Sequence, residues 1–167
     1  MLQGAIAYYR ATGDRKWLDA GIRMVNDFLL PSYGPAPLLP VISGHPEVEM
    51  SLIELYRITG DKRHLDLAGY ILGGDDRIKV PRQANIYLFS GTPFTQRTQI
   101  EGHAVRAMYA CCGAADFYLE TGDPAYWKTL NAVSYTHLDV YKRQSPRFAL
   151  RPILRARRVG RHRNARP

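Results

Sequence analysis

The sequence predicts an all-α fold built from helical hairpins, and three observations point to it. The tripeptide Thr-Gly-Asp begins at Thr12, Thr59 and Thr121, each time with a tyrosine three residues earlier. Apolar residues on both sides of each tripeptide recur at intervals of three and four, the spacing of one helix face. Long loops rich in Pro and Gly separate the hairpins. Hairpins joined by such loops are typical of a ring, or toroid, of helices whose loops border a cleft.

Each Thr-Gly-Asp turn is expected to end one helix and begin the next. Glycine readily takes the left-handed conformation that follows a helix, and aspartate is a good N-cap. A bulky pair follows each turn at a fixed distance; the pairs are Trp17-Leu18, His64-Leu65 and Tyr126-Trp127. Because so short a turn brings the two helices together in antiparallel fashion, the three units form an internal repeat of hairpins.

The helices follow from the apolar spacing. In chain order, their expected apolar faces span residues 2–9, 17–28, 48–56, 65–72 and 105–112, with a further helix running to about Val133. The loops fall at 31–44 and 73–100, and residues 86–89 are expected as a short extended piece within the second loop. Both tryptophans, Trp17 and Trp127, are expected in core or turn-packing positions, whereas His64 is expected at the surface.

The basic charge of the chain lies at one end. The whole chain has a formal net charge of +8, but residues 134–167 carry ten Arg and Lys against one acid, whereas residues 1–133 carry 13 basic and 14 acidic residues. A neutral body gives no support for specific nucleic-acid binding; that alternative would rest on residues 134–167 alone. No apolar run is long enough for a membrane span, and no signal peptide is visible, so the expected location is cytoplasmic.

The sequence predicts a boundary after residue 133. Residues 1–133 carry the repeat, and residues 134–167 open with SYTHLDVYKRQ and continue as an arginine-rich tract. The first of these strings resembles a translated sequencing-library adapter. We therefore expect residues 134–167 to be a non-native, disordered tail, since few apolar residues are available to offset the entropy of ordering it.

Two further segments carry a resemblance to a known family. Residues 44–68, GHPEVEMSLIELYRITGDKRHLDLA, and residues 101–123, EGHAVRAMYACCGAADFYLETGD, resemble the corresponding segments of glycoside hydrolase family 127, the β-L-arabinofuranosidase family. The resemblance covers residues 1–133. It implies a retaining glycosidase with an (α/α)6 toroidal catalytic domain of the six-hairpin type, acting on terminal arabinofuranosyl residues. It also implies that this chain is an inner slice of that domain, truncated at both ends.

The two Gly-His dipeptides are the candidate substrate-binding site. His45 and His103 each stand at the start of a helix in the repeat, which would bring both imidazoles to the mouth of one cavity. A neutral imidazole can hydrogen-bond sugar hydroxyls, and the resemblance implies this role for both histidines. The alternative is that each histidine caps its helix or satisfies a buried backbone group.

No catalytic residue and no metal ligand is assigned. The resemblance implies a cysteine nucleophile on a zinc site made of Cys and Glu, with a Glu as acid/base, all in motifs further downstream. Zinc is therefore expected in the parent family and not in this fragment, which is expected to be inactive. Cys111 and Cys112 lie within a helix and are expected to serve packing. Glu47 and Glu49 are expected to interact with a helix dipole. The alternative function is a non-catalytic helical-repeat binding scaffold.

Overall fold

The described part of the chain is helical. In a computed structural model, residues 1–79 and 81–144 are described, without the side chains of Arg82 and residues 135–144. The helices are α1 Leu2–Thr12, α2 Lys16–Met24, α3 Leu30–Ser32, α4 Val48–Thr59, α5 Lys62–Gly73, α6 Arg82–Leu88, α7 Ala104–Thr121 and α8 Pro124–Gln144, with a π-helical segment Val25–Leu29 and a 3-10 turn Phe94–Gln96. Within the described ranges there is no β-strand, only an isolated bridge between Tyr33 and Leu39. The predicted all-α class is confirmed.

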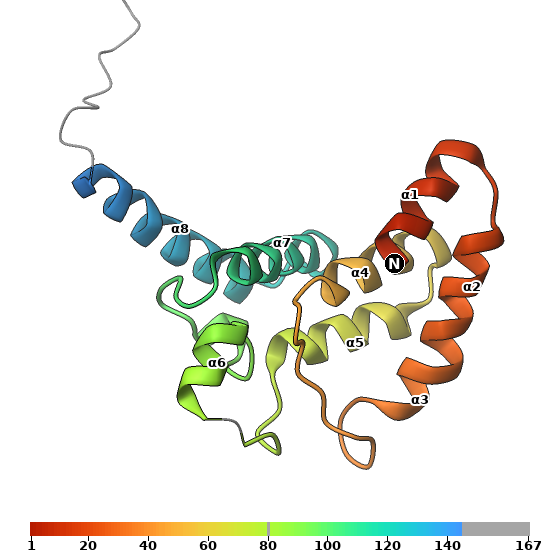
Figure 1. Cartoon of the computed structure of the whole chain (residues 1–167), viewed down its shortest axis with the longest axis horizontal. Coiled ribbons are helices and arrows are strands. Elements are labelled where there is room, and N and C mark those ends of the chain that lie inside the picture. The colour runs from red at the N-terminus through yellow and green to blue at the C-terminus, as the bar shows by residue number, and fades with distance from the viewer. Residues whose placement is uncertain (80, 145–167) are drawn as a thin grey trace, which may run out of the picture.

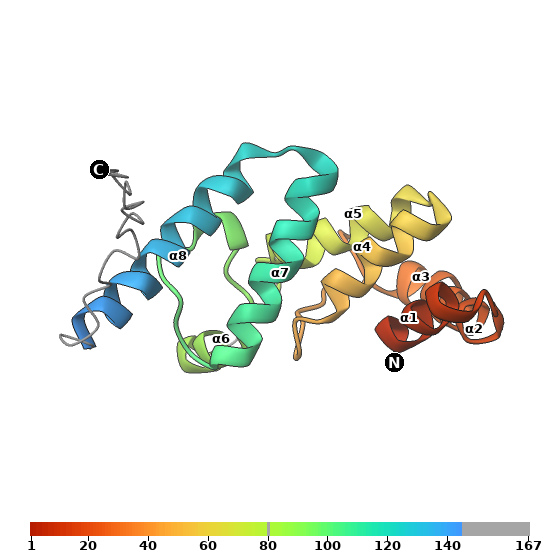
Figure 2. The ribbon, with the colours of Figure 1, turned by 90° about the horizontal axis from the view of Figure 1, so that it is seen from above.

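Three helical hairpins follow one another along an arc. They pair α1 with α2, α4 with α5, and α7 with α8, and Figures 1 and 2 show them in chain order from one end of the molecule to the other. Helix α4 is central, since it packs against α1, α5 and α7. Among the described helices, none has the length and apolar character needed to cross a bilayer.

The Thr-Gly-Asp turns have the predicted geometry. At the second turn, the Thr59 hydroxyl donates to the Leu55 carbonyl and accepts from the Asp61 amide. Gly60 is left-handed, with φ 71°. The Asp61 carboxylate accepts from the Arg63 amide at 3.0 Å and so caps α5. The other two turns repeat these contacts, which confirms that one local code builds all three hairpins.

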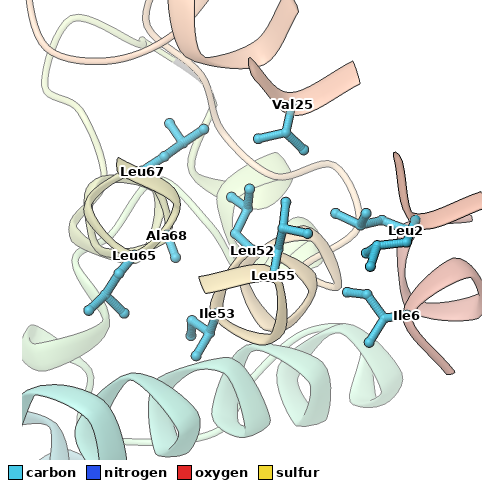
Figure 3. Packing of buried hydrophobic residues seen from close by; sticks show 10 residues of the cluster. Leu2, Ile6, Val25, Leu52, Ile53, Leu55, Leu65, Leu67 and Ala68 are labelled. Carbon is cyan, nitrogen blue, oxygen red and sulfur yellow. The ribbon is translucent and has the colours of Figure 1, made fainter. Parts of the chain in front are cut away.

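The main core lies around α4. Leu52, Ile53 and Leu55 are fully buried there, against residues of the preceding hairpin and of α5 (Figure 3). The rest of this core consists of Leu2, Ile6, Leu18, Val25, Leu65, Leu67 and Ala68. Burying one such aliphatic side chain contributes about 1.5–3 kcal/mol. A second core joins α7 and α8 to the 3-10 turn, where the small residues Ala107, Ala110 and Ala114 let α7 approach closely.

An ion-pair network also ties α4 to its neighbours. The Arg57 guanidinium on α4 bonds Glu120 at 2.6 Å and Asp116 at 3.0 Å, both on α7, and Glu54 at 2.5 Å on its own helix. Arg10 of α1 pairs with the same Glu54. Burial alone would raise the pKa of Glu54, but the two arginines outweigh it and lower that pKa. The network therefore crosses all three hairpins.

His64 is buried, so its predicted surface position is wrong. Its Nε2 lies 2.7 Å from Asn26 Oδ1 and its Nδ1 lies 3.2 Å from Thr59 Oγ1. Burial is the largest influence on its pKa and lowers it. The first turn of α5 faces the preceding hairpin, so a polar ring there bridges two hairpins.

Three other local predictions are corrected. Residues 86–89 are not extended, because α6 runs to Leu88 and ends at Phe89 in a left-handed conformation with φ 52°. Trp17 and Trp127 are 56% and 54% exposed, so neither lies in the core, where Leu18 and Tyr126 of the same bulky pairs are buried instead. Trp127 does pack at its turn, since its ring stacks on Tyr118. Helix α8 continues to Gln144 instead of ending near Val133. The tail from residue 145 onward lies outside the described residues, and the boundary after residue 133 stays a prediction.

Candidate functional site

The two predicted histidines lie before the first turns of neighbouring helices. His45 is exposed in the turn that precedes α4, and His103 is the half-buried residue directly before α7. Helices α4 and α7 pack together, and Figure 2 shows that both begin on the same side of the molecule. The two histidines precede these two helix starts. The repeat therefore brings together two residues that are far apart in the sequence.

Arg106 and Tyr87 join the two histidines into one cluster. Arg106 donates through Nη1 to the carbonyl of Gly44, and its Nη2 lies 3.4 Å from Nε2 of His45. Its guanidinium also lies over the ring of Tyr87, 4.8 Å from the ring centre. The Tyr87 ring meets the imidazole of His103 edge-on, with 5.5 Å between ring centres. We call the four side chains His45, Tyr87, His103 and Arg106 the Gly-His cluster.

Helix capping does not account for either histidine. His103 occupies the N-cap position of α7 but makes no capping hydrogen bond, and its buried Nδ1 has no hydrogen-bond partner among the described residues. The N-cap of α4 is Glu47, and the hydrogen bond found for the His45 imidazole comes from a side chain, Arg106. The capping alternative raised by the sequence is therefore wrong for both residues.

The glycines of the two dipeptides have different reasons to be there. Gly102 has φ 80°, and a Cβ at this position would lie 1.9 Å from the carbonyl oxygen of Ile86 at the end of α6. Only glycine allows the chain to approach α6 so closely. This approach brings His103 next to Tyr87, which follows Ile86 on α6. Gly44 has no atom within 4 Å of an added Cβ. Its carbonyl is instead the acceptor for Arg106.

Glu49 is a buried carboxyl with a shifted pKa near the start of α4, and the sequence did not predict its burial. It was expected to interact with the helix dipole, but its side chain is only 3% exposed and its Cβ would be 3.2 Å from a Cβ added to Gly113 of α7. Burial raises the pKa of Glu49 to about 7, against the weaker lowering influence of its own backbone amide and of the nearby Ser43. Its position three and four residues before the buried Leu52 and Ile53 was the available signal, since that spacing sets all three on one helix face.

The described residues also include Glu47 and the two cysteines, to which the sequence assigned no catalytic or metal-binding role. Glu47 is exposed and hydrogen-bonds Tyr109 of α7, which raises the pKa of that tyrosine. Burial raises the pKa of the Cys111 thiol to about 11, so its nucleophilic thiolate is disfavoured at neutral pH. Cys112 is exposed, contrary to the expected packing role. No group of three His, Cys, Asp or Glu side chains within the described ranges is arranged to hold a metal ion, so these residues do not fit a zinc site.

Comparison with known proteins identifies the family. The sequence model of the family described as "Beta-L-arabinofuranosidase, GH127 catalytic domain" matches residues 1–140. The chain belongs to this family. Among curated proteins, the non-reducing end beta-L-arabinofuranosidase of Bifidobacterium longum subsp. longum is 30% identical to it, and the match covers 77% of this chain and 23% of that protein.

Solved structures of the GH127 family share the fold. One GH127 beta-arabinofuranosidase has a TM-score of 0.71 and 35% identity, with 79% of this chain and 20% of that chain covered. The GH127 beta-L-arabinofuranosidase Ara127N-Se from Geobacillus stearothermophilus T6 also has a TM-score of 0.71, with 27% identity and coverage of 79% and 23%. The predicted family and the helical-toroid fold class are confirmed. This GH127 chain thus resembles glycoside hydrolases and spans about a quarter or less of their length.

Proposed function

We propose that the Gly-His cluster forms part of the sugar-binding surface of a retaining glycoside hydrolase that acts on terminal β-L-arabinofuranosyl residues. The observation that carries the proposal is the convergence of His45 and His103, which come from different repeat units and are linked through Arg106 and Tyr87. A neutral imidazole offers one donor and one acceptor, so two of them suit the hydroxyls of a furanose ring. The relatives named above, which are beta-L-arabinofuranosidases, support this choice of sugar.

The chain as given is proposed to bind the sugar without hydrolysing it. Glycoside hydrolysis ordinarily needs an acid/base group together with a nucleophile or a second base. Within the described residues, Cys111 holds its proton at neutral pH. No cluster of side chains there fits the zinc ion that the family resemblance implies for catalysis. The expected result for the purified 167-residue chain is no release of the aryl group from an aryl β-L-arabinofuranoside, with or without added zinc. Turnover that depends on zinc would contradict this part of the proposal.

Sugar binding is tested by NMR on the same chain. We expect methyl β-L-arabinofuranoside to shift the imidazole signals of His45 and His103 in a saturable way, and His45→Ala or His103→Ala to weaken binding. Lys62→Ala, an exposed change on α5, is the matched control and should leave binding unchanged. The alternative, a helical scaffold without sugar affinity, predicts that neither imidazole responds to the sugar.

A further inference from the structure

Arg106 is linked to both histidines, to His45 directly and to His103 through Tyr87. It follows His103, the N-cap residue of α7, by three residues and so lies in the first turn of that helix. From there its guanidinium reaches the loop before α4, where it contacts the Gly44 carbonyl and the His45 ring. These contacts bridge 62 and 61 residues of sequence. A planar group held at two points by hydrogen bonds has a fixed orientation.

The contact with His45 selects one form of that ring. A guanidinium carries five N–H donors and no acceptor, so Arg106 can only donate. The Nη2 group of Arg106 lies 3.4 Å from Nε2 of His45, which must therefore offer its lone pair. In a neutral imidazole the proton then resides on Nδ1. His45 consequently presents an Nδ1–H donor to any ligand oxygen in front of it.

The contact with Tyr87 extends the effect to His103. The guanidinium lies over the Tyr87 ring at 4.8 Å, and the same ring meets His103 edge-on at 5.5 Å. The face of an aromatic ring attracts a cation, so this contact favours the observed placement of Tyr87 beneath the guanidinium. Loss of Arg106 would therefore release Tyr87, which is 52% exposed and packs against His103.

We propose that Arg106 is a positioning residue for the sugar subsite: it holds His45 in the Nδ1–H tautomer and holds Tyr87 against His103. The proposal rests on the proposed function, because the subsite is the one formed by the two histidines. Arg106 acts through these neighbours and needs no contact with the sugar. Its role is to fix which atoms of the two rings can donate and accept.

The most direct test is to measure which ring nitrogen of His45 carries the proton. Long-range 1H–15N NMR at pH 8 on the full chain with 15N-labelled histidine distinguishes protonated Nδ1 from protonated Nε2. The wild type is expected to show His45 as the Nδ1–H form, and Arg106→Met is expected to shift it towards the Nε2–H form. Arg106→Lys should give an intermediate result, because one ammonium cannot hold both Gly44 and His45 as a fork does. Arg23→Met, an exposed change on α2, is the matched control.

The outcomes separate this inference from the proposed function. An Nε2–H form of His45 in the wild type, or no change in Arg106→Met, overturns the role of Arg106 and requires no sugar to be present. If Arg106→Met does not fold by circular dichroism, the wild-type spectrum and the Arg106→Lys variant decide the question. With methyl β-L-arabinofuranoside, Arg106→Met is expected to raise the dissociation constant about tenfold through lost preorganisation. A wild type with the Nδ1–H form that binds no sugar overturns the proposed function instead.

Discussion

Glu49 should make the fold less stable as the pH rises. Its pKa is about 7 in the folded chain, against an ordinary value of 4.5. Between these values the folded state keeps the carboxyl proton while the unfolded state loses it, so stability falls from pH 4.5 to 7 and changes little outside this window. At about 1.4 kcal/mol per pH unit, the effect of this one group is about 3 kcal/mol. Glu49→Gln keeps the shape of the side chain and removes the titration.

The assay is urea unfolding of wild type and Glu49→Gln, followed by circular dichroism between pH 4 and pH 8.5. The free energy of unfolding of Glu49→Gln minus that of the wild type should rise by about 3 kcal/mol across this range. Glu47→Gln is the matched control, because Glu47 lies two residues earlier and is exposed. Its profile should run parallel to that of the wild type. If Glu49→Gln also runs parallel, Glu49 is ionised in the folded chain and the argument from burial is refuted.

Further predictions concern the approach of α6 and the contacts between hairpins. Gly102→Ala should cost about 3 kcal/mol, because it adds a clash with the Ile86 carbonyl to a left-handed φ. Gly13→Ala, with φ 76° and no atom within 4 Å of the added Cβ, should cost about 1 kcal/mol in the same unfolding experiment, and equal costs would contradict the clash. Arg57→Met should cost about 1–3 kcal/mol, more at low salt than at high salt, since it removes a half-buried network. Arg15→Met removes the exposed pair with Asp19 and a cation–π contact with Tyr9 and should cost about 1 kcal/mol or less; a similar cost for both would mean that the network adds nothing.

The hairpins could be predicted because their code is local. Thr59, Gly60 and Asp61 contact one another and residues within one turn, so the tripeptide alone carries the information needed for the turn. The burial of His64 and the exposure of Trp17 could not be predicted this way. Each depends on which face of its helix meets the neighbouring hairpin, and adjacent positions of one bulky pair point in different directions.

Some residues of the candidate site could likewise be predicted from the sequence, and others could not. His45 and His103 were found because the dipeptide is repeated, and the family resemblance supports them. Arg106 and Tyr87 carry no local signal, since their contacts with the histidines depend on how α6 and α7 pack against the loop before α4. Glu49 had a signal in its helical register, but an acid in a first turn is also what the helix dipole favours. The burial of Glu49 involves the close approach of α7 at Gly113, which the sequence alone does not reveal.

The central claim is that His45 and His103 act together on one sugar, and a double-mutant cycle tests it most directly. The dissociation constant of methyl β-L-arabinofuranoside is measured by NMR titration for wild type, His45→Ala, His103→Ala and the double variant. If both rings contact the same ligand, each single change weakens binding and the two effects are not additive, with a coupling of about 0.5–3 kcal/mol. Unchanged sugar binding in the double variant, or no saturable binding by the wild type, would contradict the claim.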